Sequence, residues 1–551
     1  MLAESSGLTH SAPAITAQSD PEVAGNSNSG ETVQVLAKRG MRHLFVRQIF
    51  TTAVTLGGGV VLARALSPAE FGTFAIATFI VNIFMIFGDL GLGPAFIQST
   101  ETPSDKDLQT SFTLQFCLIT TVVLLTWGLA PWVVRFYPAL GPNALKLART
   151  LSLLLYIPVF HSISVIQLER GLNFRPIAWA EGVGMTLYQI VAVTCALQGM
   201  GVWSFVLGTF VAGVAGCVLV YHAAPWPIRL RFDLAEMRRI LKHGISFQSA
   251  SVVVMISQWV TPAVVGTVLG SQAVGYLGLA LANARRPFLL AESVMRVSLS
   301  HFSRLQEDVG KLHDTIDDYL LGFLWVMTMW TGFLWCCSSP FVAIIYSPKW
   351  LPAVPALVVF GLALPLDIII WIMGMCYRAT NRNWSSLKIF SARTALNITL
   401  AVLLVPRLGF IGVPWAYLAS NFVCSIMLLL GFAEGLLTRL ARRSWWLIPS
   451  AVAGYSCGRI LSEILVPARS AQPIQQFFAG ALPFAAAYLL VSLLLAPKKY
   501  RDKFFDAARS IVFSRRRPGR AIRDRFCRVQ RYSVVPHPEN LGCATSEDFQ
   551  L

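Results

Sequence analysis

Long apolar runs recur along the chain, and short polar segments separate them. A helix needs about 20 apolar residues to cross a hydrocarbon layer of ~30 Å, and about fourteen runs approach that length. The runs are 44–63, 71–90, 111–134, 150–165, 178–197, 202–221, 245–269, 274–290, 319–346, 353–375, 389–405, 410–432, 446–466 and 476–496. This pattern predicts an all-α polytopic membrane protein with about fourteen transmembrane helices.

One motif occurs twice, each time between the end of one apolar run and the start of the next. RALSPAEFGTFAIA (64–77) and TVLGSQAVGYLGLA (267–280) share Leu, Gly and Ala at equal spacing, namely Leu66, Gly72 and Ala77 in the first and Leu269, Gly275 and Ala280 in the second. A second similar pair, GMGVWSFVLG (199–208) and GFIGVPWAYLA (409–419), precedes the sixth and twelfth runs. A chance match between residues common in membrane chains is the alternative. The repeats predict two six-helix lobes related by a pseudo-twofold axis along the membrane normal.

Changes in composition divide the chain further. The first 40 residues are polar and lack an apolar stretch, which is typical of a disordered segment. The predicted units are a disordered cytoplasmic extension (1–40), an N-lobe of helices 1–6 (41–222), a cytoplasmic linker (223–244), a C-lobe of helices 7–12 (245–435), helices 13 and 14 (436–497) and a basic cytoplasmic tail (498–551).

Composition and charge agree with a membrane protein. Hydrophobic residues make up 55% of the 551 residues, charged residues make up 13%, and the mean hydropathy is +0.59. If the N-terminus is cytoplasmic, the inner segments before the tail hold 20 Lys and Arg and the outer segments hold 8, a bias typical of cytoplasmic loops. The sequence therefore predicts cytoplasmic N- and C-termini. Aromatic residues lie inside apolar runs rather than on a basic soluble face, which argues against a nucleic-acid partner.

The tail is strongly basic. Residues 498–531 hold 13 Lys and Arg against three Asp, a net charge of +10. One helical face of this segment gathers apolar residues, namely Phe504, Phe505, Ala508, Ile511 and Val512. We expect the tail to lie on the anionic inner leaflet, so that membrane lipids are partners. Docking of a polysaccharide polymerase or other assembly proteins is the alternative role.

The sequence offers no motif for catalysis, cofactor binding or metal binding. It contains no GxxxxGK[ST] and no HExxH, and its ten Cys include no CxxC. We therefore expect no catalytic residue, no cofactor and no metal. A membrane-bound polymerase or glycosyltransferase, the alternative class, would need outer carboxylates for acid–base chemistry, and the outer segments are short and poor in acids. Transport is the better function class.

Charged residues within apolar runs are expensive and are candidates for function. Arg285 and Arg286 lie in the predicted eighth helix, and Arg47 lies early in the first. A guanidinium binds phosphate through a planar, two-pronged set of donors, so these three arginines are candidate ligands of a lipid diphosphate. The alternative is that their side chains extend to the membrane interface, which is favoured for Arg47 because it lies close to the inner face.

Two acidic residues are candidates for proton or cation coupling. Asp367 follows Pro365 in LALPLDIIIWIMG and is the most deeply placed acid of the predicted helices. Its alternative role is a polar contact between helices. Asp89 lies in FGDLGLGPAFIQ near the inner end of the second helix, where capping of a broken helix is the alternative.

One long stretch resembles a known family. LARALSPAEFGTFAIATFIVNIFMIFGDLGLGPAFIQ (62–98) is similar to the N-terminal signature of bacterial polysaccharide-biosynthesis flippases, which belong to the superfamily of multidrug and oligosaccharidyl-lipid/polysaccharide exporters. LERGLNFRPIAWAEG (168–182), GMGVWSFVLG (199–208) and PWPIRLRF (225–232) add support. The resemblance extends over roughly residues 40–500.

The resemblance implies a fold and a function. The fold would be a V-shaped bundle of two six-helix lobes with two added C-terminal helices. The function would be translocation of undecaprenyl-diphosphate-linked oligosaccharide across the bacterial inner membrane by alternating access, with the lipid-linked oligosaccharide as partner. A cation-coupled multidrug exporter of the same superfamily is the alternative within transport.

Overall fold

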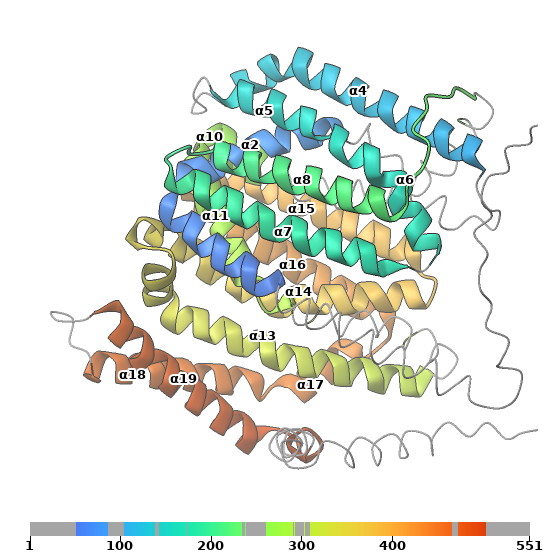
Figure 1. The fold of residues 1–551 in the computed structure, drawn as a ribbon. Coiled ribbons are helices and arrows are strands. Elements are labelled where there is room, and N and C mark those ends of the chain that lie inside the picture. Colours follow the sequence, from blue (N-terminus) through green and yellow to red (C-terminus); the bar gives the residue numbers. More distant parts are fainter. Residues whose placement is uncertain are drawn as a thin grey trace, which may run out of the picture.

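The computed structural model describes residues 51–85, 104–137, 143–171, 173–233, 261–289, 309–465 and 472–502, with the isolated residues 237, 291 and 302. These ranges are helical and contain no β-strand. The long helices run side by side across the molecule, with α4 and α5 along one edge and α18 and α19 along the opposite edge (Figure 1).

The helices follow the order of the predicted runs. The first set comprises Thr51–Ala65, α2 (Pro68–Met85), α4 (Asp105–Arg135), α5 (Asn143–Leu154), α6 (Tyr156–Arg170), α7 (Phe174–Leu197) and α8 (Trp203–Ala223). The second comprises η1 (Thr261–Val265), α10 (Gly266–Val268), α11 (Ser271–Ala284), α13 (Val309–Ile345), η2 (Pro348–Ala353), α14 (Val354–Ala379), α15 (Asn383–Leu408), η3 (Gly409–Ile411) and α16 (Gly412–Phe432). The last comprises α17 (Leu436–Ser444), α18 (Leu447–Leu465) and α19 (Pro473–Leu495).

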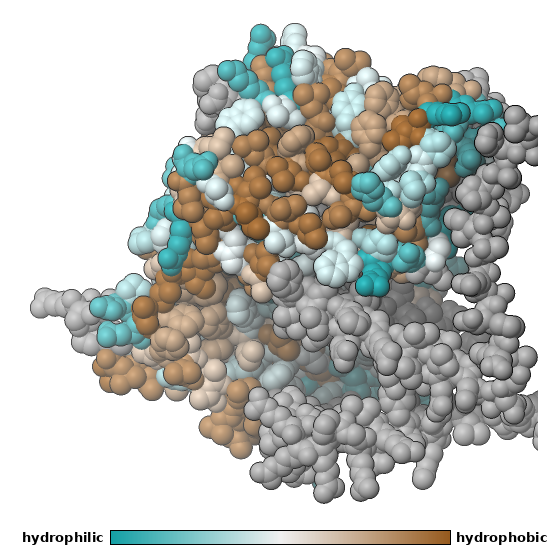
Figure 2. Space-filling model, viewed as in Figure 1, coloured by the Kyte–Doolittle hydropathy of each residue, from teal (hydrophilic) through white to brown (hydrophobic). Residues whose placement is uncertain are grey.

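The predicted number of spans is not confirmed. Most predicted runs that fall on described residues coincide with helices, but the run 150–165 spans the break between α5 and α6. Among the described residues, eight helical segments are long and apolar enough to cross a membrane, or up to nine if the bent pair Thr51–Ala65 and Pro68–Phe84 counts as one span. The bend in that pair is 117°, so these two helices fold back rather than continue. An apolar surface covers the middle of the helices, and hydrophilic residues gather toward their ends (Figure 2).

Local sequence explains where two of the helices begin. Ser67 and Glu70 form reciprocal bonds at the start of α2: the Glu70 carboxylate accepts from the Ser67 backbone N–H at 2.6 Å, and the Ser67 hydroxyl accepts from the Glu70 N–H at 3.3 Å. Ser104 and Asp107 repeat this arrangement at the start of α4, at 2.9 and 3.3 Å. Both are capping boxes, which satisfy backbone donors that a helix start leaves without partners.

The main core lies where the two sets meet. Its buried residues come from both sets, from α2, α4 and α5 of the first and from α11, α13, η2, α14, α15 and α16 of the second, with Trp350 of η2 fully buried among them. Of the candidate spans, the one that contains α14 has the largest buried share, 72%. Helix α14 is therefore the central helix of the second set.

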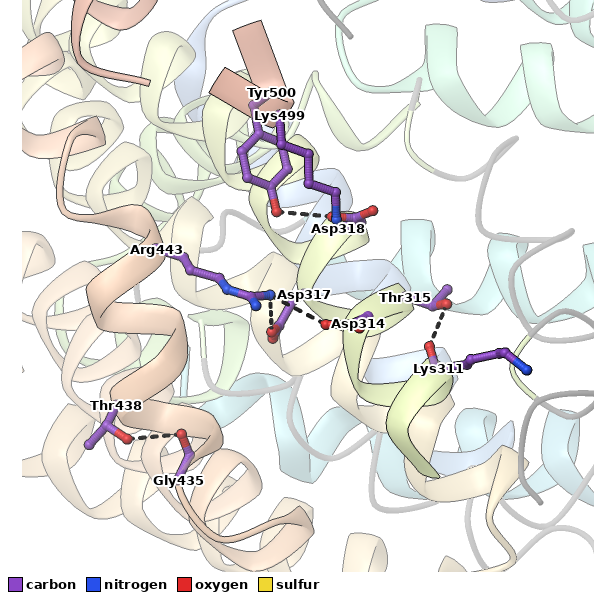
Figure 3. A network of polar contacts seen from close by, with 10 residues as sticks. All are labelled: Lys311, Asp314, Thr315, Asp317, Asp318, Gly435, Thr438, Arg443, Lys499 and Tyr500. Carbon is purple, nitrogen blue, oxygen red and sulfur yellow. Dashed lines mark hydrogen bonds and ion pairs between the residues drawn. The ribbon is translucent and has the colours of Figure 1, made fainter. Parts of the chain in front are cut away.

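Ion pairs fasten the last helices to α13 at one end of the bundle (Figure 3). Asp317 of α13 is fully buried and pairs with Arg443 of α17 at 2.6 Å. Asp318, the next residue, accepts from Lys499 and from the Tyr500 hydroxyl, both at 2.9 Å. Burial, together with the bond to Asp318, raises the pKa of Tyr500, so its hydroxyl remains a donor at neutral pH.

Candidate functional site

The structure places both predicted arginines just beyond the end of α11. The helix starts after Gly270, whose positive φ of 82° suits glycine, and it ends at Ala284. The prediction that the helix continues through residue 290 is therefore wrong at its end. Arg285 is the C-cap residue, and Arg286 follows in the same turn.

Arg285 reaches from this turn toward α14. Its Nε lies 4.0 Å from Oδ2 of Asp367, and its side chain is 49% exposed. The guanidinium also lies over the Phe288 ring, 5.2 Å from the centroid. Two of the residues singled out from sequence, Arg285 and Asp367, are thus brought together.

Asp367 is the centre of a polar network inside the second set of helices. Its side chain is 6% exposed, and it accepts from the Tyr417 hydroxyl at 2.7 and 2.9 Å and from the Asn421 amide at 2.6 Å. The Arg393 Nε donates to the Asn421 carbonyl at 2.7 Å. We call Arg285, Asp367, Arg393, Tyr417 and Asn421 the Asp367 network. One buried carboxylate here faces two arginines and two neutral donors, which satisfies the requirement that buried charge be paired and hydrogen-bonded.

The sequence did not single out Arg393, Tyr417 or Asn421. Arg393 lies within the predicted run 389–405 but is counted with the basic residues of an inner segment, whereas α15 begins at Asn383. Arg393 therefore lies ten residues into the helix, or ~15 Å at 1.5 Å per residue. The cost of placing a charged side chain in an apolar environment could have identified Arg393 as a candidate.

Arg286 has a different set of contacts. Its Nη2 donates to the Tyr346 hydroxyl at 3.2 Å, and that hydroxyl donates to the Asn283 carbonyl at 2.6 Å. Asn283 and Tyr346 are both buried, so they fix the direction of Arg286. The other two candidates, Arg47 and Asp89, lie outside the described residues.

The duplicated motif forms a contact between the two sets of helices. A Cβ added to Gly72 of α2 would overlap the carbonyl oxygen of Ser271, and one added to Gly275 of α11 would overlap that of Pro68. Pro68 and Gly72 correspond to Ser271 and Gly275 in the two motifs. The contact, which we call the α2–α11 crossing, is thus reciprocal at equivalent positions, as a local twofold axis requires. Small residues four apart allow such a close backbone approach.

Beside this crossing, side chains of each set of helices form hydrogen bonds with backbone carbonyls at helix ends of the other set. Arg64 donates to the carbonyls of Ile344 and Ile345, the last residues of α13, the latter at 2.8 Å. In return, Lys349 donates to the Arg64 carbonyl at 2.7 Å and the Trp350 indole donates to the Ala63 carbonyl at 2.7 Å. The last carbonyls of a helix have no partner within it, so each set of helices supplies donors to a helix end of the other set.

Comparisons with known proteins agree with this architecture. A family model described as "Polysaccharide biosynthesis protein" matches residues 61–355. Among the relatives, the succinoglycan biosynthesis transport protein ExoT of Rhizobium meliloti (strain 1021) is 24% identical over 55% of this chain and 61% of its own length. The lipopolysaccharide biosynthesis protein WzxC of Escherichia coli (strain K12) is 24% identical over 74% of this chain and 86% of its own length. The chain therefore spans less than two thirds of ExoT.

Solved structures share the fold. The lipid II flippase MurJ in an inward closed conformation has a TM-score of 0.65 at 18% identity, over 83% of this chain and 99% of that one. An inward-facing multidrug resistance MATE transporter of the MOP superfamily has a TM-score of 0.56 at 17% identity, over 71% and 95%. At these identities the similarity establishes fold, and it confirms the predicted all-α polytopic class.

Proposed function

The chain belongs to the polysaccharide biosynthesis protein family, and on this premise we propose that it is a flippase for undecaprenyl-diphosphate-linked oligosaccharide repeat units. It moves them across the bacterial inner membrane by alternating access, for exopolysaccharide or lipopolysaccharide assembly. The similarity to a transport protein of succinoglycan biosynthesis and to a lipid II flippase supports this proposal. Those names describe transport, and the protein is a transporter rather than an enzyme.

The observation that carries the proposal is the position of Arg285. Its guanidinium is half exposed, yet it is directed toward a buried carboxylate on the central helix α14. A side chain that faced acyl chains would instead extend to the membrane interface. A diphosphate carries more negative charge than one carboxylate, so it can compete with Asp367, whose Oδ2 lies 4.0 Å away, for the half-exposed guanidinium.

Two of the remaining candidates, Arg286 and Asp367, follow from this arrangement. Arg286 contributes a second set of donors, with one of them held by Tyr346. Asp367 couples transport to a proton, because a protonated carboxyl no longer neutralises Arg285 and Arg393. Arg47 as a further diphosphate ligand and Asp89 as a second coupling acid stay predictions.

We assign the α2–α11 crossing to the periplasmic end. The positive-inside bias places Arg64 in an outer segment, and the crossing would then close the outer exit while substrate enters from the cytoplasm. The side chains of Arg64, Lys349 and Trp350 donate hydrogen bonds to backbone carbonyls. Water can replace such bonds when the two sets separate, so the closure is reversible.

The test is the double substitution Arg285→Gln and Arg286→Gln, which removes both charges and leaves a shorter side chain that still ends in a polar amide. Charged hydrogen bonds contribute roughly 1.5–3 kcal/mol each, so export of polysaccharide at equal protein level should fall by at least about tenfold. Arg407→Gln is the matched control, because Arg407 is exposed in the last turn of α15. Unchanged export by the double variant would remove the assigned role of the two arginines.

A deletion strain separates the function classes. Without a flippase, translocated repeat units are absent outside and lipid-linked units accumulate inside. Without a polymerase, single translocated units remain outside. Without a drug exporter, glycans are unaffected and drug sensitivity rises. Only the first result supports the proposed function.

A further inference from the structure

A pocket of about 240 Å³ opens between α13 and α19, beside the ion pairs of Figure 3. Leu321, Gly322 and Trp325 of α13 form one wall, and Leu493 of α19 lies opposite. Both helices belong to candidate membrane spans. The pocket lies near the end of α19, where the chain leaves an apolar helix and enters the basic sequence KKYR (498–501).

The pocket is apolar inside and positively charged at its mouth. Asp318, Ser492, Tyr500 and Arg501 supply the polar part of the lining. The Asp318 carboxylate is neutralised by Lys499 and also accepts from the Tyr500 hydroxyl. Arg501 forms no ion pair with another described residue, and Lys498 beside it is exposed. The charge available to a ligand at this mouth is therefore cationic.

We propose that this pocket binds one anionic phospholipid, with an acyl chain against Leu321, Gly322 and Trp325 and the headgroup phosphate at Arg501. Tryptophan and tyrosine are enriched where acyl chains meet headgroups, and Trp325, Trp446 and Tyr500 all line the pocket. The anionic inner leaflet attracts basic residues next to a membrane helix. The net charge of +10 over residues 498–531 strengthens this attraction.

The bound lipid would link α13, α19 and the start of the tail. The lipid is a component of the membrane, so this assignment does not depend on what the protein translocates. The same pocket has a rival occupant in the chain itself, because Phe504 and Phe505 follow Arg501 closely in sequence. The experiment must separate a lipid from the tail.

Two substitutions block the pocket in different ways. Gly322→Leu fills it: a Cβ on Gly322 meets no atom within 4 Å, so the larger side chain enters open space and the fold tolerates it. Arg501→Gln removes the charge at the mouth. Gly216→Leu and Arg442→Gln are the matched controls, because Gly216 of α8 also has open space around its Cβ and Arg442 of α17 is an exposed arginine outside the pocket.

The measurement is the number of phosphatidylglycerol molecules that the full-length protein retains from mixed phosphatidylglycerol and phosphatidylcholine micelles, counted by native mass spectrometry. One basic residue near an anionic surface favours binding of the anionic lipid over a neutral lipid about fivefold. We expect Gly322→Leu to remove one retained lipid, Arg501→Gln to weaken the preference for phosphatidylglycerol about fivefold, and both controls to match the unsubstituted protein.

Three results would overturn the proposal. Retention of phosphatidylglycerol by both pocket variants at the level of the controls would show that no lipid uses the pocket. Competition by inorganic phosphate, with no effect of Gly322→Leu, would show a headgroup-only surface. An increase in retained lipid on combining Phe504→Glu with Phe505→Glu in the full chain would show that the tail fills the pocket.

Discussion

The α2–α11 crossing and the Asp367 network both hold helices together with polar groups, but they use different partners. At the crossing, side chains of one set of helices donate to backbone carbonyls at helix ends of the other set. In the Asp367 network, side chains of α14, α15 and α16, with Arg285 after α11, meet at one buried carboxylate. The first joins the two sets, and the second lies within one.

The difference has a physical consequence for alternating access. Backbone carbonyls at a helix end can be hydrated when their donors leave, so separation costs little. A buried carboxylate that loses its partners costs ~3–5 kcal/mol. The buried members Asp367, Tyr417 and Asn421, with Arg393, should therefore move as a unit with their helices, whereas we expect the crossing to open and close. Substitutions at the crossing should change the balance between states, and those of Arg393, Tyr417 and Asn421 should change stability.

The largest expected effect is at the glycine contact itself. Gly275→Ala places a methyl group against the Pro68 carbonyl, so the crossing cannot close without a shift of the backbone. Overpacking costs ~1–3 kcal/mol, which should reduce export by about tenfold or more at equal protein level. Gly278→Ala, one turn further along α11, is the control because its Cβ has no neighbour within 4 Å. Equal export by the two variants would show that the close approach is not needed.

A smaller effect on export is expected when one hydrogen bond to a helix-end carbonyl beside the crossing is removed. Trp350→Phe keeps an aromatic ring near Phe71, whose centroid lies 5.3 Å from that of Trp350, but it removes the donor to the Ala63 carbonyl. An unpaired buried carbonyl costs ~1–3 kcal/mol, so the closed state should be less populated and export several-fold lower.

Two variants check that interpretation. Lys349→Met removes the donor to the Arg64 carbonyl without reducing core volume, and it should shift export in the same direction by less. Trp384→Phe is neutral in our expectation, because Trp384 is 77% exposed. A loss for Trp350→Phe with no change for Lys349→Met would assign the effect to lost volume rather than to capping.

The sequence predicted the helices and the duplicated motif, but it predicted neither the α2–α11 crossing nor the network as a contact. Apolar runs of membrane length predict helices, and the motif made Gly72 and Gly275 visible as equivalent positions, but a repeat does not show that its two copies touch. Tyr417 and Asn421 are neutral and lie inside a continuous helix, and no local pattern indicates that they face Asp367. Arg393, near the start of the run 389–405, was counted with the basic residues of an inner segment, because an apolar run does not show where its polar first turns begin. Lys349 and Trp350 donate to the backbone carbonyls of Arg64 and Ala63. These carbonyls are far away in the sequence, so no local pattern predicts the two bonds.

The smallest effect on transport is expected for Tyr417→Phe, which tests whether the network is a rigid unit. The variant loses the hydroxyl that donates to Asp367 and keeps the ring beneath Arg393, whose guanidinium lies 5.6 Å from the ring centroid. A hydrogen bond to a charged group contributes ~1.5–3 kcal/mol, so thermal unfolding in detergent should occur at a lower temperature. Asp367 keeps its bond from Asn421 and stays near Arg285. Export at equal protein level should therefore change by less than about twofold.

Tyr455→Phe provides the comparison for the loss of a phenolic hydroxyl, because Tyr455 packs its ring against Trp335 on α13, away from the network. It should leave the unfolding temperature unchanged. A tenfold loss of export by Tyr417→Phe, without a change in unfolding temperature, would contradict the distinction drawn here: the hydroxyl would then act in transport, and the Asp367 network would have to rearrange when the crossing opens.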